Sequence, residues 1–459
     1  MSVSAPALSL RHRVIRAGAW TLGGHATSQA LRLASNLMMT RLLAPEMFGV
    51  MALANVIMVG LQLFSDFGLA QGVVQSSRGK DPVYLNTVWT LQILRGGLLW
   101  LLTLGIGIAI HLLAVLNWFP AESVYADPVL PYIIAALSIN VLIEGFVSTR
   151  LATASRNLTL GRVTLIELIG QGPAQACMLA WALWDRSVWA LVAGSLVYSL
   201  LRVALSHKLL PGERNALHWD QAAFREILGF GKWIFLTSIL GFLSANGDRL
   251  LLGGLTDSET LGIYAIAFFM VGALRDVFAK LIGSVSFPAF SEVVREQRDA
   301  LKRTYYRFRL PVDIATLSAS GLLFASGHLL IHFLYDDRYH AAGAMIEILC
   351  ISFFALRYSL AGQCFMALGL PKLLAPTMLI RLIALFGFMP FAFHWWGLQG
   401  AVWTIACNGL FTLPLTLYFK TRHGLFDLKR ELAVLPLLGV GYAAGLALNH
   451  AVSLLGGPA

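Results

Sequence analysis

Apolar runs about as long as a lipid bilayer is thick recur along this whole sequence, and they limit what the chain can fold into. A helix needs about 20 apolar residues to cross the hydrocarbon core. Thirteen such runs can be marked, at roughly 17–40, 47–74, 85–112, 129–150, 162–184, 187–209, 232–254, 261–286, 308–334, 341–368, 372–393, 397–419 and 432–455. The runs lack the polar–apolar alternation of barrel strands. The sequence therefore predicts an all-α protein that crosses a membrane many times.

Composition supports the same class. Charged residues make up 13% of the 459 residues, about half the share of a soluble domain, and the mean hydropathy is +0.71. A net charge of +10 would suggest a nucleic-acid partner in a soluble protein, but no nucleic-acid motif is present and the basic residues lie mostly in short loops. Four cysteines fall within apolar runs without a CxxC pair, which is typical of small buried side chains.

The distribution of basic residues predicts the orientation. With the N-terminus in the cytoplasm, about 25 of the 34 Lys and Arg residues fall on the cytoplasmic side, and only Arg41, Arg186 and Arg338 fall outside. The remaining six lie within spans. Omitting or adding one early span would destroy this asymmetry. The first run is longer than the core of a secretory signal, so we expect it to be a retained helix.

The spans form two blocks of six. We expect an N-terminal bundle at 1–210, a cytoplasmic amphipathic linker at 211–231, a C-terminal bundle at 232–420, and a basic loop with one extra helix at 421–459. Trp219, Phe224, Ile227 and Leu228 could share one face of a helix in the linker. The charged stretch 288–307 is expected to extend the eighth and ninth helices beyond the membrane.

A short internal repeat supports the two blocks. Pro45 to Ala52 matches Ser258 to Ala265 at an offset of 213 residues, each reading polar-Glu-x-apolar-Gly-x-bulky-Ala. Both copies lie between the first and second spans of a block. Six is an even number, so the two blocks enter the membrane from the same side and the repeat is parallel. Parallel repeats are one of the known plans of transporters.

Several short motifs occur in order, spread over residues 20 to 375. They are Arg41-Leu-Leu-x-Pro-Glu-x-Phe-Gly49, Asp66-Phe-Gly-Leu-x-Gln71, Asp248-Arg249, Leu261-Gly262-x-Tyr264-Ala265, Phe287-Pro288-x-x-Ser291 and Gln363-x-x-x-Ala367-Leu-Gly-x-Pro371. In these motifs the chain resembles the polysaccharide, or O-antigen-type, flippases of the multidrug/oligosaccharidyl-lipid/polysaccharide exporter superfamily, and most closely the exopolysaccharide and colanic-acid-type branch.

The resemblance implies a fold and a function. It implies two six-helix bundles in the V-shaped arrangement of the multidrug exporters, here with one further C-terminal helix. It also implies a transporter, not an enzyme, that moves an undecaprenyl-diphosphate-linked oligosaccharide from the cytoplasmic to the periplasmic leaflet of a bacterial inner membrane, by alternating access. Membrane lipids, and a polymerase or other polysaccharide assembly proteins, are the partners it suggests.

Such a cargo needs cations for its diphosphate, and charges within spans are costly unless they have a use. The guanidinium fork of arginine pairs with phosphate oxygens. We therefore mark Arg32, Arg249, Arg357 and Arg381 as candidate substrate contacts. The alternatives are local: Asp248 adjoins Arg249, Arg32 could bond helix carbonyls, and Arg357 and Arg381 could pair with Glu347 or Asp313. Arg95 is expected to snorkel to the cytoplasmic surface and Arg275 to lie at an interface.

Carboxylates within spans suggest ion coupling. Asp66 and Asp248 are the candidates for binding H⁺ or Na⁺, with structural ion pairing as the alternative. No cofactor is expected, since the chain has no nucleotide-binding loop. No metal site is expected either, since His328 and His332 lack a third ligand. Two other functions remain open: an ion-coupled multidrug antiporter of the same superfamily and a peptidoglycan lipid-precursor flippase.

Overall fold

The protein is described by a computed structural model that covers residues 10–65, 69–157 and 159–455. All regular structure in these ranges is helical, which confirms the all-α prediction. Eight helical segments among the residues searched are long and apolar enough to cross a membrane. The chain divides into two compact units, Met1–Phe242 (unit 1) and Leu243–Ala459 (unit 2).

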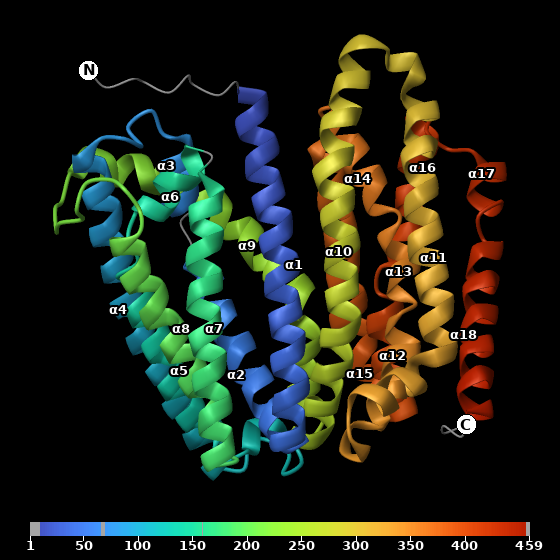
Figure 1. Ribbon diagram of the computed structural model, residues 1–459, viewed down its shortest axis with the longest axis horizontal. Helices are drawn as coiled ribbons and strands as arrows, with labels where there is room; N and C mark the ends of the chain where they lie inside the picture. The colour runs from blue at the N-terminus through green and yellow to red at the C-terminus, as the bar shows by residue number, and fades with distance from the viewer. Residues whose placement is uncertain (1–9, 66–68, 158, 456–459) are drawn as a thin grey trace. The chain divides into compact units, whose positions relative to one another are not determined.

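Unit 1 is a helical bundle whose longest members are α1 and α4 (Figure 1). The short helices α3 and α6 lie side by side at the end of the unit from which α4 starts (Figure 1). The helices are α1 (Leu10–Leu42), α2 (Pro45–Phe64), α3 (Leu69–Gln75), α4 (Pro82–Val115), α5 (Leu130–Glu144), α6 (Arg150–Arg156), α7 (Leu160–Trp184), α8 (Trp189–Lys208) and α9 (Gln221–Leu255), which continues into unit 2.

Unit 2 contains two long helices, α10 and α11, joined in a hairpin (Figure 1). Both extend into the charged stretch 288–307, as expected. The helices after α9 are α10 (Ser258–Glu296), α11 (Leu301–Leu334), α12 (Ala341–Leu349), α13 (Ser352–Leu356), α14 (Ser359–Ala367), α15 (Leu374–Cys407), α16 (Leu413–Arg422), α17 (Leu428–Leu432) and α18 (Pro436–Leu454).

Each of the thirteen predicted spans overlaps a helix, but four of them are not single helices. The span at 47–74 is interrupted where α2 ends at Phe64, and the span at 129–150 is interrupted after Glu144. The span at 341–368 is divided into α12, α13 and α14, and the span at 397–419 contains the end of α15 and the start of α16. Gly397 separates the spans at 372–393 and 397–419, and its φ of +59° interrupts the helical conformation within α15. A positive φ of this kind is accessible to glycine at no steric cost.

The repeat appears in the positions of the helices. Helix α2 begins at Pro45 and α10 at Ser258, and the helices that precede them end at Leu42 and Leu255, so both pairs are 213 residues apart. Asp257 caps α10 by accepting the backbone N–H of Thr260 at 2.7 Å. The repeated turn is therefore an architectural element that starts α2 and α10.

Residues 211–220, called here the strap, differ from the predicted amphipathic helix because they are not helical. The strap lies along the start of α4, where Asn86, Thr87 and Thr90 accept backbone N–H groups of Ala216, Asp220 and His218 at 3.0–3.1 Å. These side-chain oxygens accept the hydrogen bonds that helix carbonyls would accept if the strap were helical. The helix begins only at Gln221, and the strap is fixed to unit 1.

An ion pair ties the end of the strap to the loop before α4. Arg78 Nη2 lies 2.9 Å from Asp81 and 3.2 Å from Asp220. The Arg78 guanidinium holds the pKa of Asp81 below its usual range, and the backbone N–H of Ala223 lowers the pKa of Asp220. Both carboxylates therefore favour this arrangement at neutral pH, and they lose that contribution only as pH falls through their lowered pKa values.

The extra C-terminal helix is an integral part of unit 2. Helix α18 runs along α11 (Figure 1), and the two backbones meet at glycines. A Cβ atom built on Gly441 would lie 2.2 Å from the carbonyl oxygen of Ser318, and one on Gly321 would lie 2.1 Å from that of Leu438. Asn449 adds a hydrogen bond to the carbonyl of Ala325 at 2.6 Å. Small residues allow this close approach, which is typical of helix pairs in membranes.

We expect Gly441→Ala to lower the melting temperature of the detergent-solubilised protein, because the new methyl group forces α18 away from α11. Overpacking of this kind costs about 1–3 kcal/mol. Gly439→Ala is the matched control on the same helix, since a Cβ there meets nothing within 4 Å. Equal melting temperatures for the two variants would show that the backbones do not meet at Gly441.

Candidate functional site

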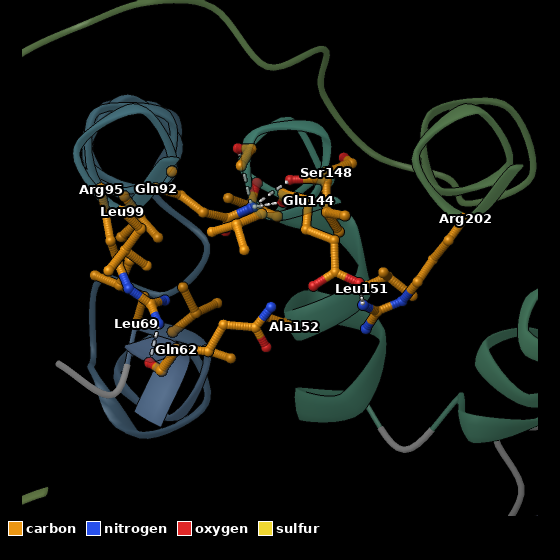
Figure 2. A pocket seen from close by; sticks show the side chains of 18 residues that line it. Gln62, Leu69, Gln92, Arg95, Leu99, Glu144, Ser148, Leu151, Ala152 and Arg202 are labelled. Carbon is orange, nitrogen blue, oxygen red and sulfur yellow. Dashed lines mark hydrogen bonds and ion pairs between the residues drawn. The ribbon is translucent and has the colours of Figure 1, made fainter. Parts of the chain in front are cut away.

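Unit 1 contains a polar cavity of about 250 Å³ where two spans are interrupted. Its walls come from the end of α2, from α3, α4 and α8, and from the break between α5 and α6 (Figure 2). Gln92 on α4 donates to the carbonyls of Glu144, Gly145 and Val147 at 3.0–3.2 Å. Non-helical backbone at membrane depth is tolerated where its N–H and C=O groups have hydrogen-bond partners in the protein or line a cavity. Here Gln92 is the hydrogen-bond donor to the three carbonyl groups.

Two arginines and one glutamate give this cavity its charge. Arg95 donates from Nη2 to the carbonyl of Gln62 at 2.5 Å (Figure 2). It also donates from Nε to Ser65 Oγ at 2.9 Å. It therefore caps the end of α2, and its side chain is half-buried. Arg202 on α8 forms an ion pair with Glu144 at 3.3 Å.

Unit 2 contains a second polar cavity of about 230 Å³, with a different charge. Arg275 from α10 and Arg381 from α15 both line it. The lining residues that the structure describes include no carboxylate, and neither arginine has an ion pair within 4 Å in this part of the chain. The other polar liners carry hydroxyl groups: Ser352, Tyr358, Ser359, Thr377, Thr412 and Thr416. Two cations beside hydroxyl groups form a site suited to an anion with several oxygens.

Arg249 extends this basic region along α9 and α10. The guanidinium carbons of Arg249 and Arg275 lie 4.3 and 5.4 Å from the centroid of the same ring, that of Phe268. The Nε of Arg249 is buried and has no hydrogen-bond partner among the described residues. Cation–π contacts stabilise arginines without neutralising them. We call Arg249, Arg275 and Arg381 the basic tract.

Asp248 does not neutralise Arg249, although the two are adjacent in sequence. Its carboxylate is buried and accepts a hydrogen bond from the hydroxyl of Tyr264 on α10. No ion pair between Asp248 and Arg249 occurs in the described structure. The local pairing that the sequence left open is therefore not formed.

The two cavities occupy corresponding places in the repeat. At an offset of 211 residues, six residues that line the unit 1 cavity correspond to six that line the unit 2 cavity: Val141, Glu144, Gly145, Val147, Ser148 and Leu151 match Ser352, Ala355, Leu356, Tyr358, Ser359 and Gly362. Gln62 corresponds to Arg275 at the offset of 213. Both cavities thus form where the fourth span of a block is broken. Of these two polar cavities, the one in unit 2 has no carboxylate among its described lining residues.

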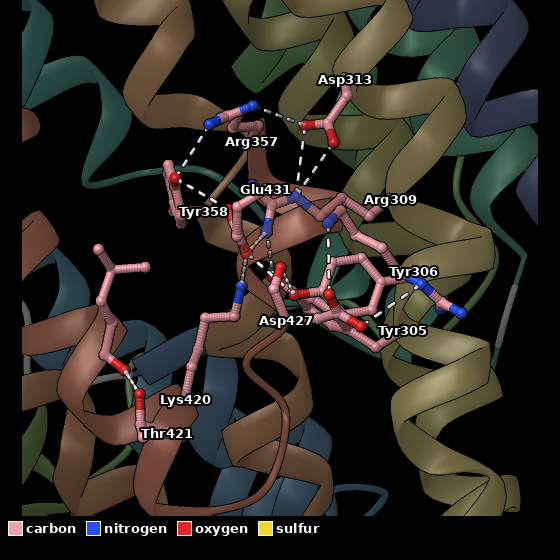
Figure 3. A network of polar contacts seen from close by, with 12 residues as sticks. Tyr305, Tyr306, Arg309, Asp313, Arg357, Tyr358, Lys420, Thr421, Asp427 and Glu431 are labelled. Carbon is pink, nitrogen blue, oxygen red and sulfur yellow. Dashed lines mark hydrogen bonds and ion pairs between the residues drawn. The ribbon is translucent and has the colours of Figure 1, made fainter. Parts of the chain in front are cut away.

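Arg357 belongs to a separate, buried charge cluster (Figure 3). Its side chain is 1% exposed, lies 3.5 Å from Asp313, and donates to the Tyr358 hydroxyl at 3.0 Å. Asp313 also accepts from Arg309 at 3.1 Å. Pairing with Asp313 was an alternative to a substrate contact in the sequence analysis. On this geometry we infer that Arg357 stabilises the packing of unit 2.

Glu431 is the centre of this cluster (Figure 3). It accepts hydrogen bonds from Arg309, Lys420 and Tyr306, and from Tyr358 at 3.1 Å. Lys420 has no exposed surface, and it immediately precedes the segment that the sequence predicted to be a basic loop. The cluster joins α17, and with it the start of the extra helix, to α11 and α16.

The remaining predicted residues have less definite surroundings. Arg32 is exposed on α1 of unit 1. Asp66 lies outside the described residues. No clear sequence signal indicates a role for Arg275, which adjoins Asp276, or the roles of Arg95 and Glu431.

The described residues contain no group of three or more His, Cys, Asp or Glu side chains that could hold a metal ion. The chemistry available in the two cavities is therefore that of arginines, one glutamate, amides and hydroxyls. Such groups bind a charged, oxygen-rich molecule through ion pairs and hydrogen bonds.

Comparison with solved structures defines the class of this fold. An inward-facing multidrug resistance MATE transporter of the MOP superfamily matches 86% of this chain and 94% of its own, with a TM-score of 0.68 and 13% identity. The lipid II flippase MurJ, in an inward closed conformation, matches 94% and 93%, with a TM-score of 0.67 and 14% identity. The chain therefore has the helical fold of the MATE-type transporters.

Sequence comparison identifies the family. Residues 38–344 match the model of the polysaccharide biosynthesis protein family, and the chain belongs to that family. The lipopolysaccharide biosynthesis protein WzxC of Escherichia coli K12 is 22% identical over 349 residues, which are 75% of this chain and 68% of that protein. A putative O-antigen transporter of Shigella flexneri is 22% identical over 410 residues, 85% of this chain and 94% of that protein.

Proposed function

We propose that the protein flips an undecaprenyl-diphosphate-linked oligosaccharide across the bacterial inner membrane for the synthesis of a surface polysaccharide. The basic tract of unit 2 binds the diphosphate, and the glycan crosses in an aqueous path while the tail stays in lipid. The N-terminus lies in the cytoplasm, as the distribution of basic residues predicts. Membership of the polysaccharide biosynthesis family supports this cargo.

The observation that carries the proposal is the charge of the unit 2 cavity. Arg275 and Arg381 line it, and none of its described lining residues can neutralise them. A diphosphate carries about two negative charges, and charge-assisted hydrogen bonds from guanidinium groups are the strongest that proteins make to phosphate. Two cations held apart from carboxylates in a low-dielectric wall thus complement this part of the cargo.

The two alternative functions, an ion-coupled multidrug antiporter and a peptidoglycan lipid-precursor flippase, fit these observations less well. A drug antiporter that exports organic cations would favour an acidic wall, which the described residues of the unit 2 cavity do not form. A peptidoglycan-precursor flippase shares the fold and the diphosphate. Family membership favours the polysaccharide cargo over that precursor.

Coupling to an ion gradient belongs to the same proposal. Asp248 is a buried carboxylate next to the basic tract and holds a hydrogen bond from Tyr264, so uptake of a proton would change the charge beside Arg249. Sodium is the alternative coupling ion. A flipping rate that is unchanged when both gradients are collapsed would remove this role from Asp248.

A deletion strain tests the proposed function in cells. Without the protein, lipid-linked repeat units should accumulate in the cytoplasmic leaflet, and surface polysaccharide should fall to background. Expression of the wild-type chain should reverse both effects. Normal export in a deletion strain that has no paralogue would overturn the proposal.

A further inference from the structure

A second cavity in unit 2 lies between α10 and α11 and differs in chemistry from the polar cavities. It has a volume of about 350 Å³ and is lined by Phe278, Ile282, Ser286, Arg307, Phe308, Pro311, Val312, Ala315 and Thr316. We call it the α10/α11 groove. On α10 its residues recur every four positions, and on α11 they form two adjacent stripes at the same spacing. A single face of each helix therefore forms each wall.

The groove is elongated. Phe278 and Ser286 are eight residues apart on α10, so the wall is about 12 Å long at 1.5 Å per residue. This length is close to the hydrocarbon depth of one leaflet, about 15 Å. Helices α10 and α11 form a hairpin (Figure 1). By residue number, Ser286 and Arg307 lie toward the end where the two helices are joined. Phe278, Ala315 and Thr316 lie toward the other end.

Polarity changes along this length. Arg307 is the only charged residue among the described lining residues, and its side chain is exposed. Arg303, one turn earlier on α11, is also exposed, and neither arginine has an ion pair within 4 Å in the described structure. Between Arg307 and the other end of the groove, the lining side chains are almost entirely apolar. The groove thus presents a basic end and an apolar body, which complements a molecule with an anionic head and a hydrocarbon chain.

We propose that the α10/α11 groove is a binding site for an anionic membrane phospholipid, with its phosphate on Arg307 and one acyl chain between the two helices. Basic residues at the ends of membrane helices are known to bind anionic head groups. The basic end lies beside the charged stretch 288–307, which the orientation predicted from sequence places at the cytoplasmic surface. This site is separate from the basic tract, so the inference does not depend on the identity of the transported cargo.

Lipid binding to purified protein tests this proposal. The delipidated wild-type chain should bind phosphatidylglycerol in preference to phosphatidylcholine, as measured by native mass spectrometry during titration. Arg307→Gln should weaken phosphatidylglycerol binding by about tenfold, the effect of one charge-assisted hydrogen bond. Ala315→Phe should weaken it comparably by filling the apolar body while leaving the charge in place. The melting temperature of each variant shows that it is folded.

Two matched controls isolate the site. Arg186→Gln removes an exposed charge in unit 1, and Ala447→Phe adds the same aromatic ring to an exposed position of α18. Both should bind phosphatidylglycerol like the wild type. Unchanged binding by Arg307→Gln and Ala315→Phe would overturn the proposal. Displacement of bound phosphatidylglycerol by a polyprenyl phosphate would also overturn it, because the groove would then belong to the cargo's tail.

Discussion

Replacing both Arg275 and Arg381 by alanine should abolish polysaccharide export while leaving a folded protein in the membrane. Each arginine is proposed to contribute charge-assisted hydrogen bonds to the diphosphate, worth about 1.5–3 kcal/mol. Loss of one should therefore reduce the apparent affinity by about 10- to 100-fold. Loss of both leaves a wall of hydroxyl groups that cannot hold a doubly charged group in a low-dielectric site.

Complementation of the deletion strain measures this effect, with protein level and melting temperature determined in parallel. Arg381→Lys should fall between the wild type and Arg381→Ala, since lysine keeps the charge but loses the planar fork. Arg186→Ala, in the exposed turn between α7 and α8, is the matched control and should export normally. Export at the wild-type level by the double variant would remove the basic tract from the site.

Glu431→Gln should be the most destabilising of the substitutions considered, by about 3–5 kcal/mol. This is the usual cost of removing one partner from a buried ion pair. Arg309 and Lys420 are at most 1% exposed and both donate to Glu431, so the amide leaves two cations without their shared charge. We expect a large fall in melting temperature in detergent, and detachment of α17 from α11.

A nearby carboxylate provides the control. Asp427 is partly exposed, lies 3.6–3.9 Å from Arg430 and Lys302, and caps α17 by accepting the backbone N–H of Arg430. Asp427→Asn keeps a capping side chain and removes only surface ion pairs, so it should cost about 1 kcal/mol or less. If Glu431→Gln were as stable as Asp427→Asn, the cluster would not be the anchor of the C-terminal segment.

The positions of the helices could be predicted from sequence more completely than their interruptions. Hydropathy locates a span because transfer to lipid depends on side-chain polarity averaged over many residues. The break after Glu144 depends instead on Gln92, more than 50 residues earlier, which satisfies the freed carbonyls. The strap differs from its prediction for the same reason, since Asn86, Thr87 and Thr90 supply its partners from another helix.

The candidate site could be predicted only in part. Arg249 and Arg381 stand out in sequence because isolated cations within apolar runs are costly. Arg275 does not stand out, since Asp276 and Lys280 beside it are typical of an interface. Arg357 matches the same pattern as Arg381, but the structure places it beside Asp313, which only tertiary contacts can determine. Glu431 was missed because it lies in a charged stretch that is typical of a solvated loop.

Flipping by the purified protein is the most direct test of the central claim. The protein would be reconstituted into vesicles that contain a polyprenyl-diphosphate-linked oligosaccharide, and the glycan reaching the outer leaflet would be measured by its susceptibility to an added glycosidase. The account predicts that wild-type vesicles expose the glycan much faster than protein-free vesicles or vesicles with the Arg275→Ala/Arg381→Ala variant. Equal rates in all three preparations would contradict it.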